Sequence, residues 1–275
     1  MKYISITFDD GRSDNYLLAK RIMDKYQLQG TVYITTGFID GTWEGKDILQ
    51  SPTRPLKTEE ILKLYNSGWE IGLHGDKHQS NVEDMHVALT KLQNWGIDNT
   101  CWGISIPNSA TNESEICELL ESEYGKQIAY IRRGRKCNTK SLFNRVLYCV
   151  YSIFKINSAY RAFNLPNICA KNKIDISNIS SVVVKSNDSP KMIVDFINRI
   201  PDDSIVVLML HSILPSTHPK HGKDPWSFDE SKFEALCSVL NTQILNNKLT
   251  VSPLMNILKG CQNETSKKQS DCMEH

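Results

Sequence analysis

Carboxylate and imidazole side chains follow three apolar runs of this sequence, at the point where each run ends. They are Asp9 and Asp10 after residues 3–8, His74 and His78 after residues 69–73, and His211 after residues 204–210. Groups of these two kinds bind divalent metals and transfer protons near neutral pH. Successive side chains of a strand point to opposite faces, so Asp9 and Asp10 can take different roles, one binding a metal and the other handling a proton.

The apolar runs are typical of β-strands, and their ends are expected to lie together. Residues 204–210 are apolar almost without interruption, as in a strand buried on both faces. In a parallel barrel the carboxyl ends of all strands meet on one face, so residues that are distant in sequence converge there. For Asp9 and Asp10 alone, the alternative is an ordinary polar turn, because Asp-Gly is a common turn dipeptide. The two runs that end in histidine favour a shared site.

Strand-like and helix-like segments alternate along the rest of the chain. The expected strands cover residues 3–8, 31–35, 69–74, 101–106, 128–131, 181–185, 204–211 and 249–252, and the expected helices cover residues 13–28, 59–67, 80–95, 113–124, 141–155, 190–199 and 227–245. Two helices would begin at the capping-box patterns Ser80-x-x-Glu83 and Ser227-x-x-Glu230.

Seven or eight such β-α units predict an α/β fold, a single-domain distorted (β/α) barrel over residues 1–259. A doubly wound open sheet is the alternative. Residues 260–275 are polar and are expected to form a frayed C-terminal tail.

The composition disfavours several classes of function. The 275 residues carry a net charge of +1, which gives no general electrostatic reason to bind nucleic acid or a membrane. Eight cysteines occur without a C-x-x-C pair, so we expect reduced thiols and no zinc ribbon. The chain begins directly with a strand and has no stretch long enough to span a membrane, so a cytoplasmic location is expected. The oligomeric state is left open.

Residues 141–155 place apolar side chains at helical spacing and also carry Arg145 and Lys155. With the preceding arginines, this pattern is compatible with a basic amphipathic surface for an anionic, lipid-linked substrate. A helix packed on a sheet predicts the same pattern and is the favoured interpretation.

Four segments together resemble the motifs of a known family. They are Thr7-Phe8-Asp9-Asp10-Gly11, Gly30-Thr31-Val32-Tyr33-Ile34, His74-Gly75-Asp76-Lys77-His78 and Leu208-Met209-Leu210-His211. In this order and at strand ends, they are similar to the polysaccharide deacetylases, also called NodB-homology or carbohydrate esterase family 4 proteins. The resemblance covers residues 3 to about 255.

The resemblance implies a role for each site residue. Asp10, His74 and His78 would bind one divalent metal, with zinc expected and cobalt, nickel or iron also compatible with these ligands. Asp9 would act as general base on a water molecule, and His211 would protonate the departing amine. The residues expected to contact the substrate are Pro107, Asn108 and Trp226.

Two departures from the family pattern affect these roles. Gly75 stands where the family usually has Ser or Thr, so a hydrogen bond that steadies the histidines would be missing or supplied by Asp76. The segment Ser105-Ile106-Pro107-Asn108 has the proline of the family's third motif but lacks its arginine. Arg132 or Arg133, after the next strand, is the candidate replacement that would keep Asp9 ionised.

The expected activity is therefore metal-dependent hydrolysis of the N-acetyl group of an N-acetylated sugar, oligosaccharide or glycoconjugate precursor. One alternative is a related amidohydrolase acting on a non-sugar amide or cyclic imide. The other is a catalytically inactive glycan-binding protein on the same fold.

Overall fold

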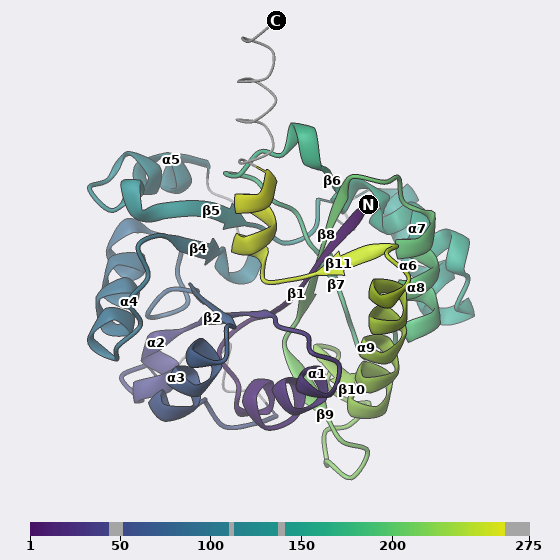
Figure 1. Cartoon of the computed structure of the whole chain (residues 1–275), viewed down its shortest axis with the longest axis horizontal. Helices are drawn as coiled ribbons and strands as arrows, with labels where there is room; N and C mark the ends of the chain where they lie inside the picture. The colour runs from purple at the N-terminus through teal and green to yellow at the C-terminus, as the bar shows by residue number, and fades with distance from the viewer. Residues whose placement is uncertain (44–51, 110–112, 137–140, 262–275) are drawn as a thin grey trace, which may run out of the picture.

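The computed structural model describes residues 1–43, 52–109, 113–136 and 141–261. Their centre is a curled sheet of mainly parallel strands, in the order β5-β4-β3-β2-β1-β8-β6, with β11 paired to β1 and β7 to β8 (Figure 1). The strands are β1 (Lys2–Phe8), β2 (Thr31–Ile34), β3 (Glu70–Leu73), β4 (Trp102–Ser105), β5 (Ile128–Arg132), β6 (Cys169–Ala170), β7 (Val182–Val183), β8 (Ser204–Leu210), β9 (Ser212–Leu214), β10 (Ser227–Asp229) and β11 (Leu249–Val251). β6 runs antiparallel to β8, and β9 pairs with β10 in a separate two-stranded sheet.

The sheet is bridged across its opening by one irregular segment. The amides of Ile131 and Arg133 donate to carbonyls of residues 176 and 179, each at 2.7 Å, and β7 then pairs with β8. The expected distorted (β/α) barrel is confirmed, and the doubly wound open sheet is not what the chain forms.

Helices cover the outside of this barrel (Figure 1). They are α1 (Arg21–Lys25), α2 (Thr36–Asp40), α3 (Thr58–Asn66), α4 (Val82–Asn94), α5 (Glu113–Glu121), α6 (Leu142–Phe154), α7 (Asn157–Asn164), α8 (Pro190–Arg199) and α9 (Glu230–Leu245), with a π-helix at Asn15–Lys20 and 3₁₀ turns at Pro107–Ser109, Gly125–Gln127, Leu165–Asn167 and Lys171–Lys173. None of the described helices is both long enough and apolar enough to cross a bilayer.

Two predicted helix starts are wrong by one or more residues. Asn81, rather than Ser80, accepts the amide of Asp84 at the start of α4, and Asp229, rather than Ser227, accepts the amide of Lys232 at the start of α9. Short polar side chains of all these types cap helices, so the pattern identified the helices but not the capping residue.

Two tyrosines and a C-terminal helix fill the interior of the barrel. Tyr33 and Tyr130 are fully buried, and a side chain at Gly72 or Gly103 would collide with them, so the glycines of β3 and β4 make room for the rings. Residues 254–261 form a helix whose apolar side chains complete this cluster. The helix continues past residue 259, and the rest of the predicted tail lies outside the described residues.

The packing predicted for α6 is wrong for most of its apolar surface. Only Tyr151 of this helix is buried, and rings of α6 pack on Phe163 of α7. Five other apolar residues of α6 are more than half exposed. Helical spacing of apolar residues indicates an apolar face, but it does not say what covers that face.

Candidate metal-binding active site

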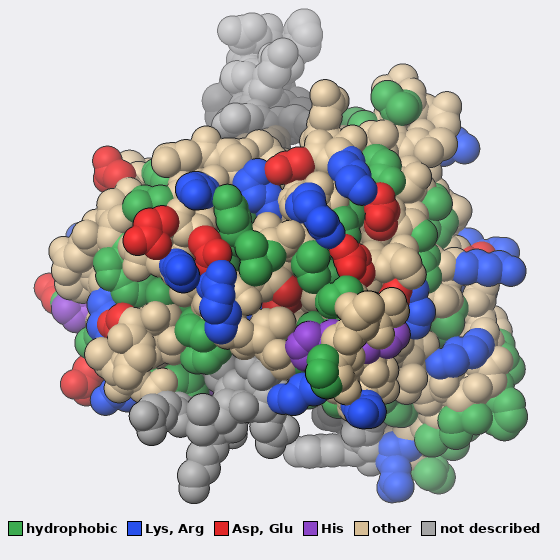
Figure 2. Space-filling view, turned by 90° about the horizontal axis from the view of Figure 1, so that it is seen from below, with side chains coloured by type: hydrophobic (Ala, Val, Ile, Leu, Met, Phe, Trp, Pro, Cys, Tyr) green, Lys and Arg blue, Asp and Glu red, His purple; other side chains and the backbone are tan. Residues whose placement is uncertain are grey.

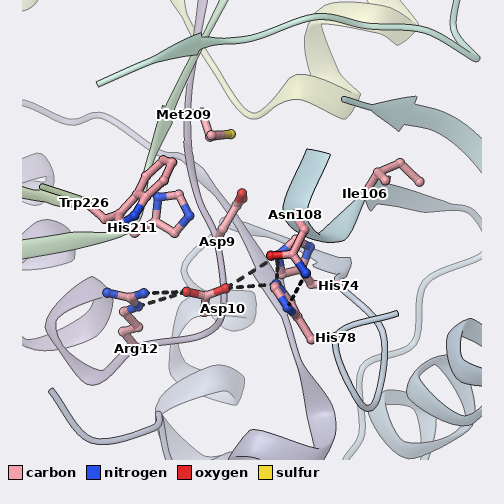
Figure 3. A pocket seen from close by; sticks show the side chains of 10 residues that line it. All are labelled: Asp9, Asp10, Arg12, His74, His78, Ile106, Asn108, Met209, His211 and Trp226. Carbon is pink, nitrogen blue, oxygen red and sulfur yellow. Dashed lines mark hydrogen bonds and ion pairs between the residues drawn. The ribbon is translucent and has the colours of Figure 1, made fainter. Parts of the chain in front are cut away.

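A pocket of about 190 Å³ opens at the carboxyl ends of the central strands. Its lining is Asp9, Asp10, Arg12, His74, His78, Ile106, Asn108, Met209, His211 and Trp226 (Figure 3). The view of this end of the barrel in Figure 2 shows histidine side chains gathered near the middle of the face. The five residues picked out by residue type at three strand ends therefore line one pocket.

The end of β1 turns sharply and directs both of its carboxylates into this pocket. Asp10 and Gly11 adopt left-handed backbone conformations, with φ of 76° and 81°. This conformation is uncommon for a residue other than glycine, and it ends the face alternation of the strand. Both side chains are nearly fully buried, yet each has its own cationic partner, as described below.

Asp10, His74 and His78 form a triangle of ligand atoms. Oδ1 of Asp10 lies 3.5 Å from Nε2 of His74 and 3.7 Å from Nε2 of His78, and the two Nε2 atoms are 3.2 Å apart. A point equidistant from the three atoms is about 2.0 Å from each, which matches zinc–nitrogen and zinc–oxygen bond lengths. Among the described residues, this is the one group of His, Cys, Asp or Glu side chains that fits an ion.

Arg12 holds the other oxygen of Asp10. Its Nε and Nη2 donate to Oδ2 at 3.0 and 2.7 Å, and its Nη1 donates to Ser212 at 2.9 Å. Burial raises the pKa of Asp10, but the Arg12 guanidinium, with His74 and His211, lowers that pKa well below its usual value. Oδ1 is thus left to face the histidines as a carboxylate. Arg12 is not among the site residues predicted from the sequence, although it directly follows the Asp-Asp-Gly motif.

The geometry distinguishes the two candidate arginines. Nη2 of Arg132 donates to both oxygens of Asp9, at 2.5 and 2.6 Å, and also contacts Ser105. Arg133 instead pairs with the exposed carboxylate of Glu113. Burial raises the pKa of Asp9, but Arg132 and two nearby histidines lower it below the usual value, so Asp9 is charged at neutral pH. Arg132 lies with Asp9, and Arg133 does not.

The segment that carries His78 is shaped by Asp84 from α4. The Asp84 carboxylate accepts the amides of Asp76, Lys77 and Gln79 at 2.8–3.0 Å. Gly75 has φ of 77°, and a side chain there would meet Asp84 at 2.3 Å. Of the two alternatives expected at Gly75, a missing hydrogen bond or one supplied by Asp76, the contacts favour the first, because the Asp76 carboxylate pairs with Thr36 and Lys91.

Both ring nitrogens of His74 have partners. Nδ1 contacts the carbonyl of Ser105 at 2.8 Å, which leaves Nε2 to point towards Asp10. Burial alone would lower the pKa of His74, but its hydrogen bond with Asp10 and the charges of both carboxylates raise it. A ring fixed by a carbonyl at Nδ1 is the usual arrangement of a metal-binding histidine.

His211 and Trp226 form the opposite wall of the pocket. Their ring centroids are 5.0 Å apart, and the indole is 40% exposed at the pocket mouth (Figure 3). Nδ1 of His211 is buried without a hydrogen-bond partner among the described residues. Burial lowers the pKa of His211, and Arg12 and His74 act in the same direction, against the opposing effect of Asp10 and Asp9.

The segment after β4 supplies the remaining predicted contacts. Asn108 lines the pocket with φ of 55°, and its Nδ2 lies 3.5 Å from Nδ1 of His78. Pro107 is buried beside it and does not line the pocket, whereas Ile106 and Met209 do. The ring of Trp43 stacks 6.0 Å from that of His78, outside the pocket lining.

A buried chain of contacts runs from Arg132 down the barrel interior. Its guanidinium lies 5.0 Å over the ring of Tyr33, whose hydroxyl is 2.7 Å from that of Tyr130. Tyr130 donates to Glu70, and Glu70 accepts the amide of Met255 at the start of the C-terminal helix. The support of Arg132 therefore extends to the opposite end of the barrel.

The model of a family described as polysaccharide deacetylase matches residues 1–116. The resemblance to the polysaccharide deacetylases is confirmed over this part of the chain. It contains the metal-ligand triangle and Asp9, whereas Arg132 and His211 lie beyond it. None of the curated proteins matches the sequence.

Several solved structures are similar to this chain. One is a family 4 acetyl xylan esterase from Clostridium thermocellum in complex with a cobalt ion, with 15% identity, 94% of this chain and 90% of that chain covered, and a TM-score of 0.49. A second is the peptidoglycan deacetylase PdaC from Bacillus subtilis, with 13% identity, 99% and 96% covered, and a TM-score of 0.47. A mutant of BA3943, a CE4 family pseudoenzyme with restored enzymatic activity, gives 10% identity, 93% and 67% covered, and a TM-score of 0.50. At these identities the likeness concerns the fold.

Proposed function

We propose that this protein is a metal-dependent hydrolase that removes an N-acetyl group from an N-acetylated sugar, oligosaccharide or glycoconjugate precursor. The observation that supports it best is one pocket in which a metal-sized ligand triangle adjoins the ionised, arginine-paired Asp9. A cavity of about 190 Å³ has room for an acetamido group and a few water molecules, at ~30 Å³ each, while the sugar ring lies at the mouth.

Asp10, His74 and His78 would hold the divalent ion, and zinc is the metal we favour. When bound, such an ion lowers the pKa of its water and polarises a carbonyl oxygen. The donor set of two imidazoles and one carboxylate is that of hydrolytic zinc sites. Arg12 keeps Asp10 ionised and turns Oδ1 towards the histidines, which is the orienting role that an outer hydrogen-bond partner fulfils.

Asp9 and His211 would move the protons. Asp9 takes a proton from the attacking water, whose oxygen then bonds to the acetyl carbon. The carbon–nitrogen bond breaks as His211 gives a proton to the departing nitrogen, and the products are acetate and a free amine. Trp226, at the mouth beside His211, would contact the sugar, and Asn108 would face the developing oxyanion. The cytoplasmic location stays a prediction.

The decisive experiment is acetate release from a panel of N-acetylated sugars and short oligosaccharides. Enzyme stripped of metal should be inactive and should recover with zinc or cobalt. Asp9→Asn should abolish release, whereas Asp24→Asn, a half-exposed carboxylate paired with Lys20, should not. A ring-opened acid as product would indicate the amidohydrolase alternative, and sugar binding without any product would indicate the glycan-binding alternative.

A further inference from the structure

The outward face of α6 is an exposed apolar surface. The exposed fractions of its large apolar residues lie between 52% and 75%, for Leu142, Phe143, Val146, Ile153 and Phe154. Ile156 and Leu165, which follow in the chain, are also exposed. Contiguous apolar patches of this kind are rare on monomeric proteins and mark interaction sites. We call these seven residues the α6 patch.

The orientation of α6 is fixed by its other side. Tyr151 packs against Tyr160 and Phe163 of α7, with ring centroids 5.2 and 5.4 Å apart, and Tyr148 packs on Phe163 at 5.9 Å. Rotation of the helix would expose these rings in exchange for the patch. The α6 patch is therefore a second apolar face of a helix that is already packed.

The helices that carry and support the α6 patch have basic residues and no acidic ones. Within α6 and α7 the charged residues are Arg145 and Arg161, and neither helix contains an aspartate or glutamate. Arg145 and Lys155 are exposed on α6 and at its C-terminal end. At the lower right of Figure 2, on the side of the molecule where α6 lies, hydrophobic side chains gather with lysine and arginine side chains beside them.

The apolar side chains of the α6 patch and the basic residues beside it distinguish between the molecules that could cover this surface. A second copy of the chain would bring two basic regions together, which like-charge repulsion opposes. Residues 262–275 contain only Cys272 and Met273 as apolar residues, too few to cover seven. An anionic lipid surface matches both the apolar and the basic residues of this region, because it accepts apolar side chains at the boundary of the acyl chains and attracts lysine and arginine.

We propose that the α6 patch docks this protein on an anionic lipid surface. The helix lies in the plane of the interface, with Phe143 and Phe154 entering the headgroup region and the basic residues facing the lipid phosphates. This proposal goes beyond the deacetylase function and does not depend on it.

The test is flotation of the full-length protein with vesicles of phosphatidylcholine alone or with about one-third phosphatidylglycerol. The protein should float with the anionic vesicles and be released by high salt. Phe143→Ser with Phe154→Ser should weaken binding at least about tenfold, as should Arg145→Gln with Lys155→Gln. The matched controls are Leu245→Ser, which is 75% exposed on α9, and the exposed Lys248→Gln.

The thermal midpoint and acetate release from a soluble substrate establish that each variant is folded, and they test the deacetylase function separately. The proposal is overturned by equal binding to both kinds of vesicle, by no binding to either, or by unchanged binding of the variants. It is also overturned if the chain is a dimer in solution that the double phenylalanine variant dissociates, because the patch is then covered by a second copy.

Discussion

Arg132 and Arg133 are neighbours in sequence, and replacing each by methionine separates the two candidates for the same role. Arg132→Met leaves the buried Asp9 carboxylate without its cation, and breaking a buried pair in this way costs about 3–5 kcal/mol of stability. Burial is the largest influence on the pKa of Asp9 and raises it, so without Arg132 that pKa rises. A base with a raised pKa is active only at higher pH, so the acidic limb of the kcat/KM profile should move upwards.

At pH 7 we expect kcat/KM of Arg132→Met to fall by about 10²–10⁴, the usual contribution of a positioned general base. Arg133→Met should keep its activity within about threefold, because the partner of Arg133 is a 71% exposed carboxylate screened by solvent. Acetate release is measured from pH 5 to pH 9, below the thermal midpoint of each variant and at equal metal content. Equal losses in the two variants, or a lower rate for Arg132→Met with an unmoved acidic limb, would refute this reasoning.

Three other predictions concern metal binding, loop geometry and stability. Asp10→Asn should weaken zinc binding more than about 100-fold, which exceeds the usual effect of losing a residue that only hydrogen-bonds to a metal ligand, and zinc should no longer raise the thermal midpoint of this variant. Titration calorimetry measures the zinc affinity, with Asp98→Asn as the control. An unchanged affinity of Asp10→Asn would exclude the triangle of Asp10, His74 and His78 as the zinc site. Asp84→Ala removes the acceptor of three amides and should weaken zinc binding about 10–100-fold, while the exposed Glu83→Ala should not; similar affinities in both variants would contradict a role for Asp84. Burial raises the pKa of Asp188 to about 6, above its unfolded value of about 3.9, so the folded state loses stability as pH rises from about 4 to 6. The side chain of Asp188→Asn cannot titrate, so between pH 4 and pH 7 the free energy of unfolding of this variant, measured in urea, should rise by about 2–3 kcal/mol relative to that of the wild type. If the difference between the two unfolding free energies does not change with pH, Asp188 is not the titrating group.

The sequence predicts those parts of the site that depend on strand ends alone. Runs such as residues 204–210 specify a buried strand by composition, and a parallel barrel brings all carboxyl ends to one face. Asp9, Asp10, His74, His78 and His211 could be found in this way, and the structure brings them into one pocket. The helix predicted over residues 190–199 also has these bounds in the structure, as α8.

Other features depend on geometry that is not local in the sequence. The left-handed backbone at Asp10 and Gly11 brings the Arg12 side chain back to the Asp10 carboxylate, and the pattern of side chains in the sequence does not predict this turn of the backbone. In the sequence, Asp84 is an ordinary acidic residue in the first turn of a predicted helix. Only the structure shows that the backbone amides of Asp76 and Gln79 donate to its carboxylate. The spacing of apolar residues in α6 also does not predict which side of the helix packs against the rest of the protein, because both of its sides are apolar.

Arg132 shows how an arginine can reach the Asp9 carboxylate from β5 instead of from β4. Ser105 of β4 and Arg132 of β5 are paired in register, so their side chains leave neighbouring strands at the same height of the barrel. Ser105 is fully buried and small, and the Arg132 guanidinium contacts its hydroxyl on the way to Asp9. An arginine at the end of β4, where the family motif would have it, would therefore compete for the space that the Arg132 side chain fills. Because neighbouring parallel strands end side by side on one face, a cation can serve the same carboxylate from either strand, provided that the other position stays small. We therefore propose that Arg132, on the neighbouring strand and 27 residues later than Ser105, takes the place of the arginine that the third motif lacks.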